Sequence, residues 1–490
     1  MSVATPRLLI GIEVHLQLKT RTKCFSSSPV SFGADPNTLL DPTSAGLPGA
    51  LPVLNREAVR QGIRTGLALG CRIAAITKWD RKSYFYPDLP KGYQISQFDQ
   101  PLCVEGAVEI EGDDGQLKRV RIRRAHLEED TGRSTHDVGG SKSRVDLNRA
   151  GTPLLEIVSE PDLASAEEAV RYLEALREIV AYVGTSDGNM QEGNLRCEPN
   201  VNLVYANGDR TPIVEVKNIN SVQAVRMAIE FEAQRQAEAY EARGETADNT
   251  PRSTRGFDDV RQVTVHQRSK ESADDYRYFP EPDLPPLRIP VSYVEDLRAT
   301  LPELPRVKRQ RYVDGLGLSA YDAGVLTADP VLATWYEAAL AGPKGQRDPK
   351  AVATWVSTEL LRYVNDERLA LGDVALTPEG LGELVDLLDE GTITRRTAQE
   401  LFREVVKSGA SPAALVAERG LARVQDTGAV EAAAAAAIEA NAAAWADWVG
   451  GNEKAKGRLF GAVMKALAGQ GDPAVVAQVL ERMVSEARGA

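Results

Sequence analysis

The sequence predicts an α+β fold: a body built on a mixed or antiparallel sheet, followed by an all-helical arm. Three observations predict it. Apolar and polar residues alternate with period two, the pattern of half-buried strands, near residues 8–18, 117–130, 194–204 and 212–218. Amphipathic helical spacing occurs between them, at 164–183 and 221–242. After about residue 292 the strand patterns stop, and Ala and Leu recur at helical spacing.

Length and charge limit the class of protein. The 490 residues predict two or three domains, and a composition of 43 % hydrophobic and 26 % charged residues is ordinary for a globular chain. The formal net charge of −12 argues against a protein that coats nucleic acid without specificity. It still permits binding of a particular RNA through a local basic patch.

The four cysteines indicate a reduced compartment. Cys24, Cys71, Cys103 and Cys197 lie far apart and form no CxxC pair, so they predict neither a disulfide framework nor a zinc site. The first residues, MSVATPRLLIGIEVH, lack the pattern of a signal peptide. No apolar run is long enough to span a membrane, so we expect a cytoplasmic protein that is not bound to a membrane.

The first predicted strand carries a chemically rich polar face. Because side chains alternate along a strand, the apolar residues from Ile10 to Leu18 share one face, while Glu13, His15 and Gln17 share the other. Packing explains the apolar face. The polar face, with a carboxylate, an imidazole and an amide, is typical of the floor of a site.

The next segments are punctuated by turns. Gly and Pro at 46–54 predict a loop, because both residues interrupt regular structure. Tyr84–Pro90 recurs loosely as Tyr278–Pro285, with aromatic residues leading into a Pro-Asp turn in both. Two similar turns explain so short a match. The polar stretch 243–259 predicts a mobile loop.

The second predicted strand ends in acidic residues. Arg124, His126, Glu128 and Asp130 share a face, and Glu129 points the other way. Clustered carboxylates repel one another unless a cation compensates them, and they suit Mg²⁺. A solvated acidic turn is the alternative, although the polar face of the first strand makes it less favoured.

Two further strands repeat this design. Arg196 and Glu198 lie on the polar side of 194–202, and Glu215 and Lys217 share a face of 214–220. One polar-faced strand is commonly just exposed to solvent. Several such strands, mixing acids, bases and amides, predict a sheet whose face forms a binding cradle.

The arm reads as two helical modules. Thr377 followed by Pro378 predicts a helix start, with Thr as the N-cap. The run from Glu431 to Trp448 contains six consecutive alanines and is a helix by propensity. Residues 450–465 form a Gly-hinged basic turn leading into another helix. The predicted domains are 1–292, 293–408 and 409–490.

The absence of three common motifs limits the kinds of nucleotide site and nucleophile that the chain can contain. The chain has no GxxxxGK[ST] loop, no GxGxxG after a strand and no GxSxG elbow. A P-loop, a Rossmann site and a serine nucleophile of that type are therefore disfavoured. If the protein uses a nucleotide, carboxylate-held Mg²⁺ on an open sheet must bind it.

Together these motifs resemble the B subunit family of bacterial tRNA-dependent amidotransferases (GatB). The resemblance runs nearly from end to end. It rests on Gly11–Leu18, Leu47–Asn55, Arg81–Gln97, His126–Asp130, Val145–Val158, Met190–Cys197, Val216–Ser221 and Asp275–Leu284.

This resemblance implies a fold and a reaction. The body would be a cradle domain of glutamine-synthetase-like fold with kinase activity, and the arm would be a helical domain followed by a YqeY-like tail domain that binds tRNA. ATP would phosphorylate the side-chain carboxylate of Glu-tRNA(Gln) or Asp-tRNA(Asn). Ammonia from the A (amidase) subunit would then form the amide, within a complex that also contains a C subunit.

The resemblance also implies site residues. Glu128 and Glu129 would be catalytic, and Glu13, His15 and Glu128 would bind Mg²⁺ for ATP. Weaker assignments for ATP or substrate contact are Glu192, Arg196 and Lys217. In the tail, Lys454, Lys456 and Arg458 would contact tRNA phosphates. Two alternatives are a non-catalytic tRNA-binding scaffold and a stand-alone ligase of the glutamine-synthetase type, which the basic helical tail disfavours.

One departure from the family concerns zinc. Many members carry a CxC…CxxC zinc set near the N-terminus, but here the corresponding segments are Phe25–Ser28 and Asp41–Ser44. Because the ligands are absent, no zinc is expected.

Overall fold

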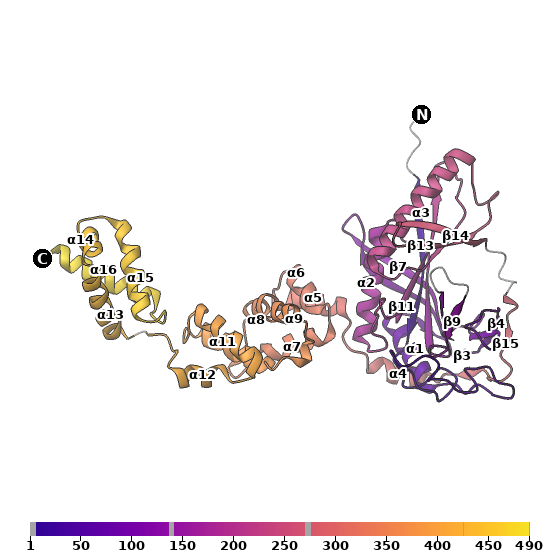
Figure 1. Cartoon of the computed structure of the whole chain (residues 1–490), viewed down its shortest axis with the longest axis horizontal. Helices are drawn as coiled ribbons and strands as arrows, with labels where there is room; N and C mark the ends of the chain where they lie inside the picture. The colour runs from indigo at the N-terminus through magenta and orange to yellow at the C-terminus, as the bar shows by residue number, and fades with distance from the viewer. Residues whose placement is uncertain (1–5, 137–141, 270–275, 425, 490) are drawn as a thin grey trace. The chain divides into compact units, whose positions relative to one another are not determined.

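The chain folds into two compact units, Met1–Pro305 and Arg306–Ala490 (Figure 1). The computed structural model describes residues 6–136, 142–269, 276–424 and 426–489. Each unit is considered by itself. The first holds the sheet, and the second is almost entirely helical.

The first unit is built on a nine-stranded sheet that is antiparallel except where β12 meets β13. This confirms the prediction of a mixed or antiparallel sheet followed by a helical region. In spatial order the strands are β14 (Val263–Ser269), β13 (Ser253–Asp258), β12 (Val214–Lys217), β11 (Leu195–Val204), β1 (Arg7–Gln17), β10 (Pro153–Ser159), β7 (Leu117–Glu129), β6 (Cys103–Glu111) and β2 (Arg72–Ile73).

Three helices pack against the sheet: α1 (Arg56–Ala68), α2 (Ala166–Tyr182) and α3 (Val222–Arg243). In Figure 1, α2 and α3 run along one side of the strands. The hydroxyls of Ser165 and Ser221 accept hydrogen bonds from backbone amides in the first turns of α2 and α3. These two helices confirm the predictions for 164–183 and 221–242.

Strand alternation separates the core from the polar face. Ile10, Ile12 and Val14 of β1 are completely buried in the main apolar core, which also contains side chains of all three helices. Glu13 and His15 therefore point to the other face. The burial of the apolar side fixes which side chains β1 presents to the site.

Smaller strand pairs complete the first unit. A three-stranded sheet joins β15 (Phe279–Pro280), β4 (Asp80–Ser83) and β5 (Tyr93–Ser96), and β5 contacts β7. Figure 1 shows β4 and β15 on the side of the large sheet away from α2 and α3. Two-stranded ribbons pair β3 (Ile76–Thr77) with β16 (Leu287–Arg288) and β8 (Arg133–His136) with β9 (Ser143–Asp146). Helix α4 (Val291–Ala299) packs against α1.

The structure corrects the prediction of a loop over 243–259. Residues 253–258 form β13, which hydrogen-bonds to β12 and β14. Polar side chains hid this strand, because it lies near the sheet edge and one of its two partners, β12, is distant in sequence. The similar segments near Tyr84 and Tyr278 lie side by side, since Phe279 of β15 pairs with Arg81 of β4.

The second unit contains two apolar cores. One holds residues between Tyr312 and Val416, and the other holds residues between Val430 and Val484. The helices of the first core are α5 (Pro305–Leu316), α6 (Ala320–Thr327), α7 (Pro330–Leu340), α8 (Pro349–Trp355), α9 (Leu361–Glu367), α10 (Pro378–Asp389), α11 (Arg395–Ser408) and α12 (Pro412–Arg419). A short π-helix at Val356–Leu360 and a 3₁₀ turn at Leu371–Asp373 lie between them, as does the ribbon formed by β17 (Ala341–Gly342) and β18 (Gly345–Gln346).

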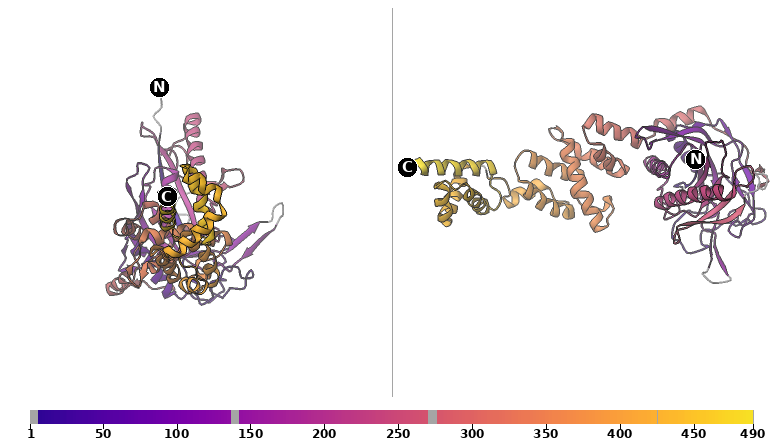
Figure 2. Two further views of the ribbon diagram at one scale, coloured as in Figure 1. Left: turned by 90° about the vertical axis from the view of Figure 1, so that its left-hand side faces the viewer. Right: turned by 90° about the horizontal axis from the view of Figure 1, so that it is seen from above.

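The second core is formed by α13 (Thr427–Ala440), α14 (Ala442–Val449), α15 (Lys456–Ala466) and α16 (Pro473–Gly489), with a short 3₁₀ turn at Glu453–Ala455 (Figure 2). Thr377 caps α10 as predicted, since its hydroxyl accepts from the Gly380 amide. The alanine-rich run is helical but is interrupted at Asn441. Leu415 and Val416 of α12 pack in the first of these cores. The domain boundaries at 292 and 408 stay predictions.

Candidate functional site

The polar face of five adjacent strands brings acidic and basic side chains together. Backbone register sets their rows, because β1 lies between β10 and β11. His15 is opposite Glu156 of β10 and Arg196 of β11, and Glu156 is in turn opposite His126 of β7. One row of the sheet thus alternates imidazoles with a carboxylate and ends in a guanidinium.

The first acidic cluster consists of His15, Glu128 and Glu156, with His126 beside it. His15 Nε2 lies 3.7 Å from Glu128 Oε1 and 3.4 Å from Glu156 Oε2. His126 Nε2 lies 3.8 Å from Glu128 Oε2 and 3.5 Å from Glu156 Oε2. Both carboxylates are buried. The Ser96 hydroxyl of β5 donates to Glu128 Oε2 at 3.1 Å.

The second acidic cluster consists of Glu13, Glu198 and Glu215, from β1, β11 and β12. One carboxylate oxygen of each lies within 4.8 Å of the others. Asn200 Nδ2 donates to Glu13 Oε1 at 3.0 Å, and the Thr254 hydroxyl donates to Glu215 Oε2 at 2.9 Å. Lys217 forms ion pairs with Glu198 and Glu215. Glu13 and His15 are two residues apart on β1, so the two clusters are neighbours.

Electrostatics show an excess of negative charge. Burial raises the pKa of Glu13, and the charges of Glu156, Glu215 and Glu198 raise it further. Burial alone would lower the pKa of His15, but its hydrogen bond to Glu156 and nearby carboxylates outweigh this and raise the pKa to about 9. Both shifts mean that added positive charge is favoured at this site.

The donor set fits a divalent cation. Each cluster offers three groups whose ligand atoms lie within 4.8 Å of one another. Carboxylate oxygens are the ligands that Mg²⁺ and Mn²⁺ take, and imidazole is a common additional donor. His15 Nδ1 and His126 Nδ1 are buried, and within the described residues neither has a hydrogen-bond partner. The imidazoles are thus held by packing and by the carboxylates on their Nε2 side.

Asp130 organises the end of the first cluster. Its carboxylate accepts from Arg196 Nη1 at 2.8 Å and Arg196 Nη2 at 3.0 Å, and from Gln17 Nε2 at 2.9 Å. Burial would raise the pKa of Asp130, but the guanidinium groups of Arg196 and Arg149 hold it far below its ordinary value. Asp130 is therefore a fixed anion that orients Arg196 across the strand ends, and Gln17 serves the same network.

Glu129 is placed apart from both clusters. It pairs with Lys91, and its Oε1 accepts from the Ile95 amide at 3.0 Å. Strand alternation predicted that it points away from Glu128, and the contacts follow that geometry. The structure divides the predicted metal residues: His15 and Glu128 lie in the first cluster, and Glu13 lies in the second. Arg196 lies at the end of the first cluster and Lys217 lies in the second, whereas Glu129 faces β5.

A cavity of about 760 Å³ opens beside Gln17 and Arg196. Glu192 is exposed on its wall, and its amide is held by Asn189 in a loop before β11. The cavity is also lined by Arg21, Arg133 and Arg149. Glu192 therefore lies at the mouth of the site, outside the acidic clusters.

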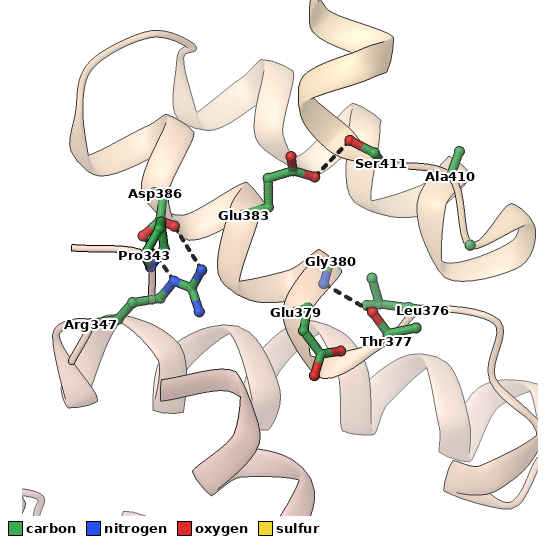
Figure 3. Close-up of a pocket in the computed structure, with 11 residues that line it drawn as sticks. Pro343, Arg347, Leu376, Thr377, Glu379, Gly380, Glu383, Asp386, Ala410 and Ser411 are labelled. Carbon is green, nitrogen blue, oxygen red and sulfur yellow. Dashed lines mark hydrogen bonds and ion pairs between the residues drawn. The ribbon is translucent and has the colours of Figure 1, made fainter. Parts of the chain in front are cut away.

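In the second unit the structure places the three predicted tail cations around the start of α15. Lys454 and Arg458 are exposed, whereas Lys456 forms an ion pair with Glu481 of α16 at 2.5 Å. A further cavity of about 400 Å³ lies near the start of α10 (Figure 3). Four of its polar side chains are engaged in the pairs Arg347–Asp386 and Ser411–Glu383. We assign no site to it.

The segments Phe25–Ser28 and Asp41–Ser44 are joined by hydrogen bonds. Ser26 Oγ donates to Asp41 Oδ2 at 2.6 Å, and Ser44 Oγ donates to the same oxygen at 3.0 Å. The amides of Thr43 and Ser44 donate to Asp41 Oδ1. Asp41 thus connects Phe25–Ser28 with Asp41–Ser44.

Sequence reasoning missed two residues of the first cluster region. Glu156 sits in the run Leu154–Val158, which is otherwise apolar, and a single acid inside such a run was the available signal. Lys82 of β4 was also missed. Burial would lower its pKa, but Glu128, Tyr278 and Glu156 raise it, so Lys82 is a cation facing the cluster.

Comparison with known proteins identifies the family of this chain. A family model described as the GatB/GatE catalytic domain matches residues 8–295, and one described as the GatB domain matches residues 339–484. Three similar proteins are each named as the B subunit of an aspartyl/glutamyl-tRNA(Asn/Gln) amidotransferase. That of Geotalea uraniireducens is 48% identical, covering 97% of this chain and 98% of the relative.

The protein of Myxococcus xanthus is 44% identical over 99% of this chain and 100% of its own length. That of Geobacillus kaustophilus is 46% identical over 96% of this chain and 98% of its own length. Among the described residues, no helix combines the length and apolar character needed to cross a bilayer. The chain belongs to the GatB family, the B subunits of tRNA-dependent amidotransferases.

Proposed function

We propose that this chain uses ATP to activate the side-chain carboxylate of Glu-tRNA(Gln) or Asp-tRNA(Asn), which becomes the amide of Gln-tRNA(Gln) or Asn-tRNA(Asn). The observation that carries the proposal is the pair of neighbouring acidic clusters on one sheet face, one around His15 and one around Glu13. The name shared by the relatives, which calls them B subunits of an aspartyl/glutamyl-tRNA(Asn/Gln) amidotransferase, supports the choice of substrate.

The reaction explains why such a site is needed. A carboxylate is a poor electrophile, so an oxygen of the substrate carboxylate attacks the γ-phosphorus of ATP and ADP leaves. Ammonia then attacks the acyl carbon, and inorganic phosphate leaves with the former carboxylate oxygen. In the first step negative charge is spread over the transferring group, and positive charge nearby stabilises it.

Glu13, His15 and Glu128 are proposed to hold Mg²⁺. His15 and Glu128 would do so with Glu156 in the first cluster, and Glu13 with Glu198 and Glu215 in the second. When bound, Mg²⁺ supplies positive charge against the phosphate oxygens of ATP. The residues themselves fix the donors: Ser96 orients Glu128, and Asn200 orients Glu13. Glu128 remains our proposed catalytic residue, and Glu129, which pairs with Lys91 outside the clusters, is proposed to act by positioning its neighbours.

The roles of these two residues differ. Glu128 faces the cluster, whereas Glu129 acts on the reaction through Lys91 and the Ile95 amide, which it holds. Arg196, fixed by Asp130, is proposed to contact phosphate or the substrate carboxylate. Lys217, which pairs with Glu198 and Glu215, and Glu192, at the cavity mouth, are proposed to contact ATP or substrate.

The wider assignments rest on the family. We infer that the sheet is of the glutamine-synthetase-like kinase type, which its mostly antiparallel strands and acidic face support. The chain would work in a complex with an A subunit that releases ammonia and with a C subunit. Lys454, Lys456 and Arg458 would contact tRNA phosphates from a YqeY-like tail domain, and a role in translation suits the cytoplasm.

The test uses the assembled A, B and C subunits with Glu-tRNA(Gln), ATP and glutamine. We expect Glu128→Ala to remove ATP-dependent amide formation while glutamine hydrolysis by the A subunit continues. A folded Glu128→Ala protein with full amide formation would make the cluster structural. The chain would then be a tRNA-binding scaffold, and the proposal would be wrong.

A further inference from the structure

Five aromatic rings form a continuous surface in the first unit, which we call the aromatic surface: Tyr84, Tyr86, Phe98, Tyr276 and Tyr278. Ring centroids of Tyr84 lie 6.1 Å from Tyr86 and 6.0 Å from Tyr276, in edge-to-face geometry. Tyr276 lies 6.1 Å from Tyr278. The rings come from two segments far apart in sequence, on either side of the β4–β15 pair. The proposed reaction leaves them without a role.

The aromatic surface borders the first acidic cluster. Ser96, two residues before Phe98, donates to Glu128. Lys82 Nζ lies 5.0 Å from the centroid of Tyr276, and the charges of Glu128 and Glu156 act on the same amine. Lys82 therefore links the rings to the carboxylates. A group bound on these rings lies next to the reaction centre.

Phe98 ends the row of rings with a free face. Its ring is stacked on Tyr278 at 4.3 Å between centroids and 13° between planes. Although Tyr278 covers one face, Phe98 is still 44% exposed. A flat group added on the open face would extend the parallel stack. Exposed aromatic faces beside cations are the usual platform for unpaired bases.

Positive charge accompanies this face. Arg124 Nη1 donates to the Phe98 carbonyl at 3.2 Å, so its guanidinium is held at the Phe98 backbone. Arg124 Nε is buried, and within the described residues it has no hydrogen-bond partner. Lys82 and Arg124 thus place two cations near the end of the row. This combination suits a planar base that carries phosphate.

We propose that the open face of Phe98 stacks the adenine base of a substrate. The proposal rests on the proposed function, whose two substrates both carry an adenine base. One source is ATP, and the other is the 3′-terminal adenosine of the tRNA, which is esterified to the amino acid. Stacking of one base on an aromatic side chain changes affinity by about 5- to 150-fold.

Binding measurements on the full A, B and C complex test the proposal. ADP with Mg²⁺ is titrated by calorimetry, and uncharged tRNA is titrated separately with and without its terminal adenosine. Phe98→Leu keeps apolar volume but removes the ring. We expect this variant to bind one of the two ligands with about 10-fold lower affinity. Phe98→Trp should retain or tighten binding, because it keeps an aromatic face.

The pattern of loss identifies the source. Weaker ADP binding by Phe98→Leu means that the ring stacks the base of ATP. Weaker binding of complete tRNA, with equal binding of tRNA that lacks the terminal adenosine, means that it stacks the tRNA base. Leu117→Ala is the matched control. Leu117 is exposed at the end of β7 opposite to Glu128, so this variant should bind both ligands as wild type does.

Two outcomes would overturn the proposal. Unchanged binding of both ligands by a folded Phe98→Leu complex excludes a stacked base. Loss of assembly with the A subunit, with ligand affinities of the isolated chain intact, shows that the surface docks a protein instead. Neither outcome bears on the proposed function. That proposal would instead be contradicted by full amide formation in a complex that carries Glu128→Ala. The two claims are therefore separable.

Discussion

His15 Nε2 and Glu156 Oε2 lie 3.4 Å apart, directly opposite one another on β1 and β10. The strands that carry them are separated by more than a hundred residues of chain, yet antiparallel pairing sets the two groups in one row. His126 flanks Glu156 from β7 in the same way. Glu128 lies 3.7 Å and 3.8 Å from the two imidazoles of this row, so two buried carboxylates meet there.

Glu156→Gln should weaken binding of a divalent cation to the chain by at least about 10-fold. The change keeps the shape of the side chain but removes one of three anionic or imidazole donors in the first cluster. Calorimetric titration with Mn²⁺ measures it. Glu160→Gln is the control, because Glu160 pairs with Arg123 just beyond β10 and should bind as wild type does. Equal Mn²⁺ affinity in both variants would remove Glu156 from the donor set.

Glu129→Gln should mainly lower stability, by about 3 kcal/mol. The substitution leaves the charge of Lys91 without its partner, and both side chains are buried. Urea unfolding followed by fluorescence gives the free energy of unfolding, and Mn²⁺ titration of the same variant serves as the control. Loss of Mn²⁺ affinity at wild-type stability would show that Glu129 is a ligand, contrary to its contacts.

Lys23 should make stability rise with pH in the alkaline range. Burial lowers its pKa to about 8, against about 10.5 in an unfolded chain, and its Nζ donates to the Leu39 carbonyl. Between these values the unfolded chain binds more protons, so the free energy of unfolding increases as pH rises from about 8 to 10.5. The gain is about 1–2 kcal/mol after screening by water.

Measurement of unfolding at pH 7.5 and pH 10 in wild type and Lys23→Met isolates this effect. The variant should lack the extra gain, since other groups titrate equally in both proteins. A wild type and a variant with the same pH dependence would show that Lys23 titrates normally in the folded chain.

Lys454→Ala with Arg458→Ala should weaken tRNA binding and reduce its salt dependence. Each lost phosphate contact lowers the slope of log affinity against log salt by about 1. Both side chains are exposed at the start of α15. Filter binding at several salt concentrations measures the slope. Lys407→Ala, an exposed lysine at the end of α11, is the control.

Removal of the second apolar core of the second unit tests tRNA binding by the tail more strongly than the point substitutions do. The cut belongs after Val424, because Leu415 and Val416 pack in the preceding core and a cut at 408 would expose it. The shortened chain should lose tRNA affinity and keep ATP hydrolysis. Undiminished tRNA affinity would contradict the assignment of the tail.

The sequence predicts much of the site because one strand reveals its own faces. Period-two alternation placed Glu13 with His15 and set Glu129 opposite Glu128, and the contacts of Glu129 agree. Glu156 was missed because its neighbours in β10 are apolar and buried on both faces of the strand. Such a run gives no sign of which face a single acid occupies.

The sequence alone could not predict which acidic residues meet in one cluster, for a different reason. Glu198 and Glu215 were recognised on polar faces, but their meeting with Glu13 depends on the order β12-β11-β1 and on register. Those are long-range pairings that local patterns do not encode. The same limit explains β13, whose polar sequence resembles a loop until its partners are known.

ATP-dependent amide formation by the A, B and C complex carrying Glu128→Ala tests the central claim most directly. The substrate is Glu-tRNA(Gln), and melting temperature and glutaminase rate confirm folding and assembly. The acidic clusters predict a loss of at least about 100-fold in amide formation while glutaminase activity persists. Wild-type amide formation by the folded variant would contradict a cation-binding role for the cluster and leave the chain as a scaffold for tRNA.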